Sequence, residues 1–337
     1  MRSTLPFSGL TAAVLTTVVT LATTTEASAV PRFEAFGADS VWKADVSSAP
    51  LNPNSAALVT NLVGQVAANY GTAAFNVNTY GTSIYTVPAD QPLIDVTWVD
   101  CQRKGKAPAG LLGEGGQFTA VPIPADAVPA AGTDGQLTIH SPSTDTLWEF
   151  WKAKRVNGQW TACWGGRLDD VSTSEGYFEG WWGASASGLA VSGGSVLIQD
   201  AQAGVIDHAL SLQIPNVQDK AVFSWPAQRS DGSDLTPNAI PEGLRFRLDP
   251  AVNVEALNLT PIAKMVARSA QKQGFIVTDR AGAVAVVAES PSAVTAATGI
   301  NPWTALMKGK KSYEIFKNFP WDKMQALPMD YGEPQVP

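Results

Sequence analysis

The chain has 337 residues and a formal net charge of -7, with 16% charged and 45% hydrophobic residues. Net acidity argues against nucleic acid or an anionic membrane surface as a partner, because both carry negative charge. The apolar content is sufficient for a sizeable core, so we expect one large domain or one domain with an appendage.

The N-terminal residues 1–29 have the order of residue types that is typical of a cleavable secretory signal peptide. Arg2 provides a positive start, residues 10–21 provide a short apolar core, and residues 27–29 provide the small-x-small cleavage pattern Ala-Ser-Ala. An apolar stretch of about a dozen residues is shorter than the roughly 20 that cross a bilayer. The sequence therefore predicts a secreted, extracellular protein that has no membrane span and begins near Val30.

A helix is predicted first, and many short strands follow it. In residues 55–70, leucine and valine recur at helical spacing before a glycine. Runs rich in β-branched and aromatic residues, separated by turn residues, then predict strands. These runs cover residues 83–87, 93–101, 135–140, 147–156, 159–166, 195–199, 205–214 and 244–248. We therefore predict a mainly β fold, with a jelly-roll-like β-sandwich over residues 30–250.

The sequence pattern changes after the predicted sandwich. A helix is predicted over residues 260–273, because a threonine followed by proline can cap its start and a glycine follows its end. The runs 275–278 and 283–289 predict a hairpin. Residues 251–337 are therefore predicted to form a small C-terminal α+β appendage.

The most informative segment is the tryptophan-rich stretch 147–166, which contains Asn157-Gly158. This dipeptide between two strand-like runs predicts a β-hairpin, since a type I′ turn needs positive φ at both central positions. In the resulting register Trp151 faces Trp164. Because side chains alternate along a strand, one face is predicted to carry Glu149, Trp151, Arg155, Trp160 and Trp164.

This face suits a sugar, because flat rings stack on the apolar faces of pyranoses and a carboxylate can do acid-base work. Glu149 is therefore a candidate catalytic residue, and the candidate substrate-binding residues are Trp151, Trp160, Trp164 and Arg155. The alternative is that the tryptophans fill the sandwich core, with Glu149 at its rim. His140, on the polar side of a strand end, is the second candidate catalytic residue, suited to proton transfer in a lyase.

Cys101 and Cys163 are predicted to form a disulfide, because an even pair of cysteines in an exported protein is usually a structural bridge. Asp145 and Asp170 face each other in the extended hairpin register, and a structural calcium ion would relieve their repulsion. Residues 230–234 (Ser-Asp-Gly-Ser-Asp) are loosely similar to a calcium loop, with a plain polar turn as the alternative. No other cofactor is predicted, and no nucleotide, nicotinamide or esterase motif is present.

Several phrases of the sequence resemble those of a family of secreted bacterial proteins of uncharacterised function. They include WEFW at 148–151, IDHAL at 206–210, PEGLRFRL at 241–248 and FPWD at 319–322. The resemblance covers most of the chain after the predicted signal peptide. It implies export and a single architecture, and it implies no catalytic residues.

These observations lead to three hypotheses for the function. The first is a secreted glycan-active protein that binds an extracellular polysaccharide or cell-wall glycan; if it cleaves this glycan, it is a glycoside hydrolase or a polysaccharide lyase. The second is a non-catalytic, lectin-like module that uses the same rings. The third is a structural protein of the cell envelope with no small ligand.

Overall fold

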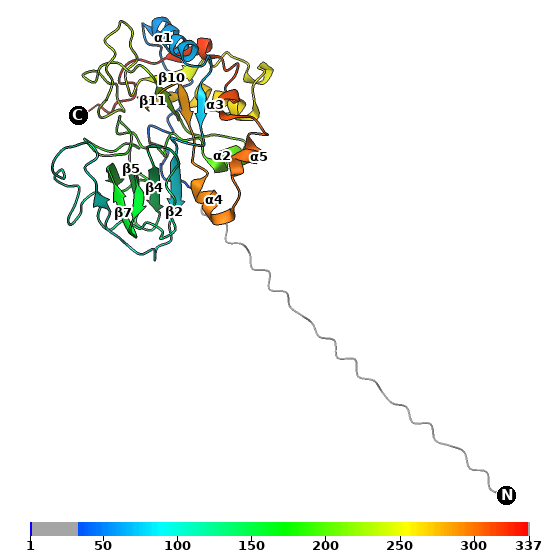
Figure 1. The fold of residues 1–337 in the computed structure, drawn as a ribbon. Helices are drawn as coiled ribbons and strands as arrows, with labels where there is room; N and C mark the ends of the chain where they lie inside the picture. Colours follow the sequence, from blue (N-terminus) through cyan, green and yellow to red (C-terminus); the bar gives the residue numbers. More distant parts are fainter. Residues whose placement is uncertain (2–32, 336–337) are drawn as a thin grey trace. The chain divides into compact units, whose positions relative to one another are not determined.

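Apolar runs that are far apart in the chain pair side by side in a six-stranded mixed sheet (Figure 1). A computed structural model describes Met1 and residues 33–335, and residues 33–335 belong to one compact unit. The strands, in spatial order, are β1 (Ala74–Asn76), β12 (Ala285–Val287), β9 (Leu210–Ile214), β11 (Phe275–Arg280), β10 (Arg245–Leu248) and β13 (Met324–Ala326). β1 pairs with β12 in parallel, as does β9 with β11, and the other pairs are antiparallel.

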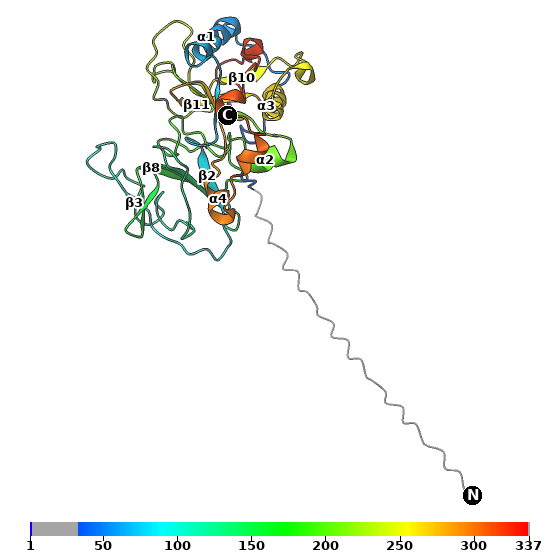
Figure 2. The ribbon, with the colours of Figure 1, turned by 45° about the vertical axis from the view of Figure 1, so that its right-hand side comes forward.

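The main core lies around this sheet and includes α1 (Ser55–Ala68) and α3 (Pro261–Lys272). Both helices lie in the same part of the molecule as β10 and β11 (Figure 2). The start of α3 follows from its sequence: the Thr260 hydroxyl accepts a hydrogen bond from the Ala263 backbone N–H at 3.1 Å. Gly274, with φ of 81°, follows its end. The predicted helix over residues 260–273 is therefore confirmed, as is the helix predicted from residue 55.

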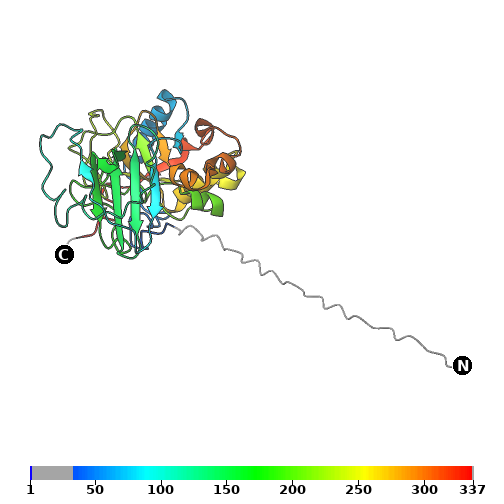
Figure 3. The same cartoon turned by 60° about the horizontal axis from the view of Figure 1, so that its bottom comes forward.

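The tryptophan-rich segment belongs to two smaller sheets. One has four strands in the order β2 (Thr82–Thr86), β4 (Gln136–Ser141), β5 (Thr146–Trp151) and β8 (Trp164–Leu168), seen side by side in Figure 3. The other has three strands in the order β3 (Thr97–Trp98), β7 (Gln159–Ala162) and β6 (Lys154–Val156). Asn157 and Gly158 have φ of 50° and 84° and join β6 to β7. The predicted hairpin and its register are confirmed, because Trp151 pairs with Trp164.

Short helices complete the described part of the chain. The α-helices are α2 (Ile198–Ala203), α4 (Ser292–Thr298) and α5 (Pro302–Leu306), and the 3-10 helices are η1 (Val254–Ala256), η2 (Ser312–Glu314) and η3 (Trp321–Lys323). Over this part of the chain, no helix combines the length and the apolar character needed to cross a bilayer. The predicted signal peptide, residues 1–29, lies outside the described residues apart from Met1.

The prediction of a β-rich fold is confirmed. The finer prediction of a jelly-roll-like sandwich gains no support from the strand pairing, because each sheet contains a parallel pair and a jelly roll is antiparallel. No break in the fold corresponds to the predicted boundary at residue 250, since β10 pairs with both β11 and β13. The predicted hairpin of 275–278 with 283–289 is wrong, because β9 lies between β11 and β12.

The six-stranded sheet predicts a sharp contrast between two leucines. Leu212 lies in β9 with an exposed fraction of 0%, whereas Leu235 is 84% exposed. We expect Leu212→Ala to lower the free energy of unfolding by about 2–5 kcal/mol, because it removes buried apolar surface and leaves a cavity. Leu235→Ala, the matched control, should change it by less than about 0.5 kcal/mol. Urea unfolding measures both, and equal effects would contradict the placement of β9 at the centre of the core.

Candidate functional site

A cavity of about 950 Å³ lies between the four-stranded and the six-stranded sheets. One side is lined by residues of β4, β5 and β8, and the other by residues of β1, β9, β11 and β12. Loops that carry further tryptophan, acidic and basic side chains complete the lining. The volume is at the upper end of the roughly 300–1,000 Å³ that is common for small-molecule sites.

The cavity has an aromatic wall made by Trp151, Trp164, Trp181 and Trp182, with Tyr80 also in the lining. The rings of Trp164 and Trp182 stack, with centroids 5.3 Å apart and planes inclined by 20°. Trp181 is 75% exposed, which is unusual for so large an apolar side chain. A flat apolar ligand can therefore reach the Trp181 ring directly. The Trp151 ring carries Lys152 over one face, with the Nζ atom 4.4 Å from its centroid.

Polar contacts hold the aromatic wall in place. The indole N–H of Trp151 donates to Asp134 Oδ1 at 3.1 Å, and that of Trp164 donates to the Trp181 carbonyl at 2.9 Å. These bonds satisfy the polar end of each ring and fix its orientation. The ring faces in the cavity are therefore set before any ligand arrives.

The predicted disulfide between Cys101 and Cys163 is confirmed, with Cα atoms 5.6 Å apart. It ties the loop after β3 to the residue immediately before β8. Two residues of this loop, Gln102 and Lys104, line the cavity, and Lys104 Nζ lies 3.8 Å from the centroid of the Trp164 ring. The disulfide thus positions a cation over one of the indoles.

Arg229 holds the loop that carries Trp181 and Trp182. Its guanidinium donates to the carbonyl of Trp182 at 2.6 Å and to that of Ser185 at 2.7 Å, with longer contacts to the carbonyls of Gly180 and Gly183. Burial lowers the pKa of Arg229 to about 10, which leaves the group charged at neutral pH. A half-buried cation therefore organises this loop.

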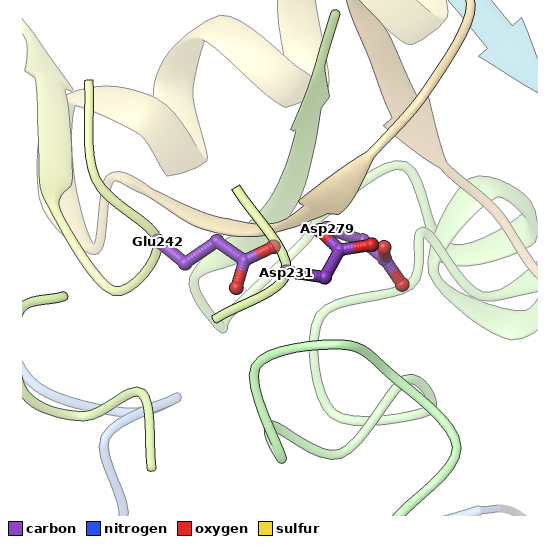
Figure 4. A group of neighbouring side chains, drawn as sticks. All are labelled: Asp231, Glu242 and Asp279. Atoms are coloured by element: carbon purple, nitrogen blue, oxygen red, sulfur yellow. The ribbon is translucent and has the colours of Figure 1, made fainter. Parts of the chain in front are cut away.

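Three carboxyl groups gather at the cavity. One oxygen each of Asp231, Glu242 and Asp279 lie within 4.8 Å of one another, and the side chains come together from different segments (Figure 4). Asp231 and Asp279 line the cavity. Glu242 has an exposed fraction of 0% and lies behind them. The cluster thus has two members that a ligand can reach and one that it cannot.

Local irregularities of the backbone place these carboxyl groups. Phe275 and Val277 face the main core, and simple alternation would turn Asp279 toward the same core. The register of β11 against β9 shifts between Val277 and Asp279, so a bulge at Thr278 changes the side to which Asp279 points. Gly243 lies against the Ser224 carbonyl, where an added Cβ would come within 1.6 Å, so the chain beside Glu242 is closely packed.

The carboxyl groups of the cluster differ in environment. Asp279 accepts hydrogen bonds from the backbone N–H of Ala186 at 3.1 Å and of Arg280 at 2.8 Å. Neither oxygen of Glu242 accepts a hydrogen bond of good geometry, although the Ser230 hydroxyl and the Asp231 backbone lie near it. Burial, with Asp279 and Asp231 close by, raises the pKa of Glu242 to about 9. Burial, with Asp231 and Asp134 close by, raises the pKa of Asp279 to about 7.

Two arginines balance the ionised members of the cluster. Arg229 lies close enough to Glu242 and Asp279 for their charges to raise its pKa, against the larger effect of burial. Burial raises the pKa of Asp231, and the nearby Arg280 opposes this rise. With Glu242 protonated at neutral pH, two aspartates face two guanidinium groups. The ionised carboxylates of the cluster are therefore offset by positive charge nearby.

The structure brings only some of the predicted site residues into the cavity. Trp151 and Trp164 line it, as the hairpin register implies. Trp160 is 3% exposed and packs in a second core with Trp148, so its prediction as a binding residue on the same face is wrong. The physical reason is Lys152, whose φ of 56° ends β5 and interrupts the alternation before β6. Arg155 is exposed outside the cavity and donates to the Ala125 and Gly158 carbonyls.

Glu149 lies in the protein interior and not in the cavity. It is 1% exposed and accepts hydrogen bonds from the backbone N–H of Val191 at 2.9 Å and of Ser192 at 2.8 Å, and from the Ser192 hydroxyl at 2.7 Å. Burial raises its pKa, and these bonds oppose the rise. The contacts give Glu149 a structural role in holding the segment around residue 191, so we no longer consider it a catalytic candidate.

The other predicted residues also lie outside the cavity. His140 is buried at the end of β4 beside Phe33, and burial lowers its pKa. Asp145 and Asp170 lie in turns beyond the ends of β5 and β8, with φ of 49° each, and not opposite each other in strands. The Asp145 carboxylate accepts hydrogen bonds from the backbone N–H and hydroxyl of Ser172, which satisfies it without an ion.

The residues that the sequence did not reveal are Trp181, Trp182, Glu242 and Asp279. Asp231 belongs to the acidic stretch 230–234, so that stretch did carry a signal of local chemistry. Asp279 had no comparable signal, because its position in the cavity depends on a bulge that alternation does not predict. The cluster also joins residues that are far apart in the sequence, because Asp231 and Glu242 precede β10 and Asp279 lies in β11.

Comparisons with known proteins add no assignment. The chain matches no protein-family description, no curated protein and no solved structure. Its function therefore has to be inferred from the geometry of the site.

The contacts of Glu149 predict a large effect on stability and none on binding. Glu149→Gln replaces one acceptor oxygen with an NH₂ group that faces a backbone N–H, so we expect a loss of about 2–4 kcal/mol in the free energy of unfolding. Urea unfolding measures this loss. Ligand affinity, measured well below the unfolding temperature, should not change. A loss of affinity with unchanged stability would restore Glu149 to the site.

The carboxyl cluster predicts that stability falls as pH rises. In the unfolded chain these groups lose their protons near pH 4, whereas the folded protein keeps them up to about pH 7 at Asp279 and about pH 9 at Glu242. The folded state binds more protons across this window, so rising pH favours unfolding. Glu242→Gln removes one such group and should flatten the fall between about pH 7 and pH 9 by up to roughly 1.4 kcal/mol per pH unit. An unchanged slope of unfolding free energy against pH would contradict the protonated state of Glu242.

Proposed function

We propose that the protein binds an extracellular glycan in the cavity between the two sheets. The observation that carries the proposal is the set of indole faces in a cavity of about 950 Å³ that also holds carboxylates. Indole rings offer flat apolar surfaces to the C–H groups of pyranose rings, and carboxylates accept hydrogen bonds from hydroxyl groups. The two requirements for sugar recognition therefore occur side by side.

The charges of the lining favour a neutral glycan. The cavity is lined by three cationic side chains, Lys104, Arg229 and Arg280, and by three acidic ones, Asp134, Asp231 and Asp279. This balance gives no strong field for an acidic or a basic polymer, unlike a groove with charges of one sign. A chain of neutral hexoses or N-acetylhexosamines fits this balance best.

The extracellular location is part of the proposal. Residues 1–29 predict export, and the Cys101–Cys163 disulfide is typical of an oxidising compartment. A polysaccharide outside the cytoplasm is then a natural ligand. Two alternatives keep the same location: a lectin-like module would use the cavity for binding alone, whereas a structural envelope protein would not need so large a cavity with exposed indole rings.

The aromatic wall predicts which substitution weakens binding without affecting stability. Trp181→Ala should weaken glycan binding by about tenfold or more, because an aromatic contact contributes on the order of 1 kcal/mol or more and the ring is already exposed. Because Trp181 is 75% exposed, its removal should leave the unfolding temperature nearly unchanged. The measurement is calorimetric titration with soluble fragments from a panel of neutral polysaccharides.

The matched control is Tyr70→Ala. Tyr70 is an 87% exposed aromatic residue at the end of α1 that does not line the cavity. Affinity should be the same as in the wild-type protein. Unchanged glycan affinity in Trp181→Ala, or absence of binding by the wild type to every member of the panel, would contradict the proposed function.

A further inference from the structure

We propose that the protein hydrolyses the glycan that it binds, with Asp279 as the general acid and Asp231 as the nucleophile of a retaining glycoside hydrolase. This inference rests on the proposed function, because the glycan must first occupy the cavity. It assigns the chemistry to two carboxyl groups that line the cavity, which the hairpin carboxylate Glu149 does not.

The separation of the carboxyl groups supports this assignment. Oxygens of Asp231 and Asp279 lie within 4.8 Å of each other. Retaining glycosidases place their two carboxyl groups about 5–5.5 Å apart, whereas inverting enzymes need roughly 6.5–9.5 Å to admit a water molecule between sugar and base. The observed spacing is nearer to the first range than to the second, so direct attack by a carboxylate fits better.

An unsatisfied polar atom in the cavity lining points to a ligand. Gln136 lines the cavity and is 5% exposed, yet its Oε1 has no hydrogen-bond partner. The buried Glu242 extends toward the two aspartates, and neither of its oxygens has a partner of good geometry (Figure 4). Buried polar atoms are rarely left without partners. Hydroxyl groups of a bound sugar would satisfy Gln136.

The two aspartates are suited to different roles. Burial, with Asp231 and Asp134 close by, raises the pKa of Asp279 to about 7 against the backbone hydrogen bonds that it accepts, so part of it is protonated at neutral pH. Asp231 is the more exposed of the two; burial raises its pKa, and Arg280 and the Glu242 carboxyl group oppose this rise. A proton donor and an ionised carboxylate beside one bond are what glycoside hydrolysis requires.

A bound cation is the other way to relieve a group of carboxylates, and the local charges disfavour it. Arg229 and Arg280 already lie beside the cluster and offset two negative charges. The third carboxyl group, Glu242, keeps its proton up to about pH 9. A divalent ion would have to displace this proton and approach two guanidinium groups.

The reaction proceeds in two balanced steps. First, an oxygen of Asp231 bonds to the anomeric carbon, the bond from this carbon to the leaving oxygen breaks, and that oxygen takes the proton of Asp279. Next, a water molecule gives a proton to Asp279 while its oxygen bonds to the anomeric carbon and the bond to Asp231 breaks. One water is consumed, and both carboxyl groups return to their starting states.

The test measures new reducing ends from each polysaccharide that binds, together with the anomer of the first product by NMR. The wild type should release products with retained configuration. Asp279→Asn and Asp231→Asn should lower kcat/KM by about a hundredfold or more, with dissociation constants within about threefold of the wild type. Asp145→Asn, a carboxylate outside the cavity, is the matched control and should keep full activity.

A second readout guards against a folding defect in these variants. Asp231→Ala should regain turnover in sodium azide and form a glycosyl azide, because the small anion replaces the missing nucleophile. Binding by the wild type without turnover of any bound polysaccharide would overturn the inference and leave the proposed function standing. Loss of turnover in EDTA with recovery in calcium, or full activity of both asparagine variants, would also overturn it. Absence of binding would refute the proposed function itself.

Discussion

The cavity depends on the half-buried guanidinium group of Arg229. Its short hydrogen bonds to the carbonyls of Trp182 and Ser185 hold the loop that carries two of the four tryptophans. Its charge also lies close enough to Glu242 and Asp279 to stabilise their ionised forms. One side chain therefore links the aromatic wall to the acidic cluster, and a neutral residue at this position would leave the loop carbonyls and the carboxylates without a common partner.

Local signals in the sequence predicted local structure well. Asn157-Gly158 predicted the hairpin and its register, and Thr260 with the following proline predicted the start of α3. The arrangement of the six-stranded sheet could not be predicted in this way, because β9 inserts between β11 and β12, which are close in sequence. Such pairings depend on the packing of the whole core, and no periodicity within a short segment reports them.

Only the part of the site that depends on local structure could be predicted from the sequence. Trp151 and Trp164 follow from the hairpin register, whereas Trp160 turns into a core because Lys152 breaks the alternation. Glu149 has the right neighbours in sequence, but Val191 and Ser192 satisfy it in the interior. The carboxylates that do reach the cavity come from separate segments, and a bulge in β11 changes the direction of one of them. The hairpin region therefore supplies two of the aromatic rings of the cavity, and other segments supply its carboxyl groups.

The central claim is that a glycan occupies the cavity between the sheets, and hydroxyl-radical footprinting read by mass spectrometry tests it most directly. The protein is oxidised alone and with a saturating glycan, and the rate is measured at each aromatic residue. Trp181 and Trp151 should be protected by the glycan, while Tyr70 and Tyr313, which are exposed outside the cavity, should react at unchanged rates. Protection at Tyr70 or Tyr313, with Trp181 still reactive, would contradict the account.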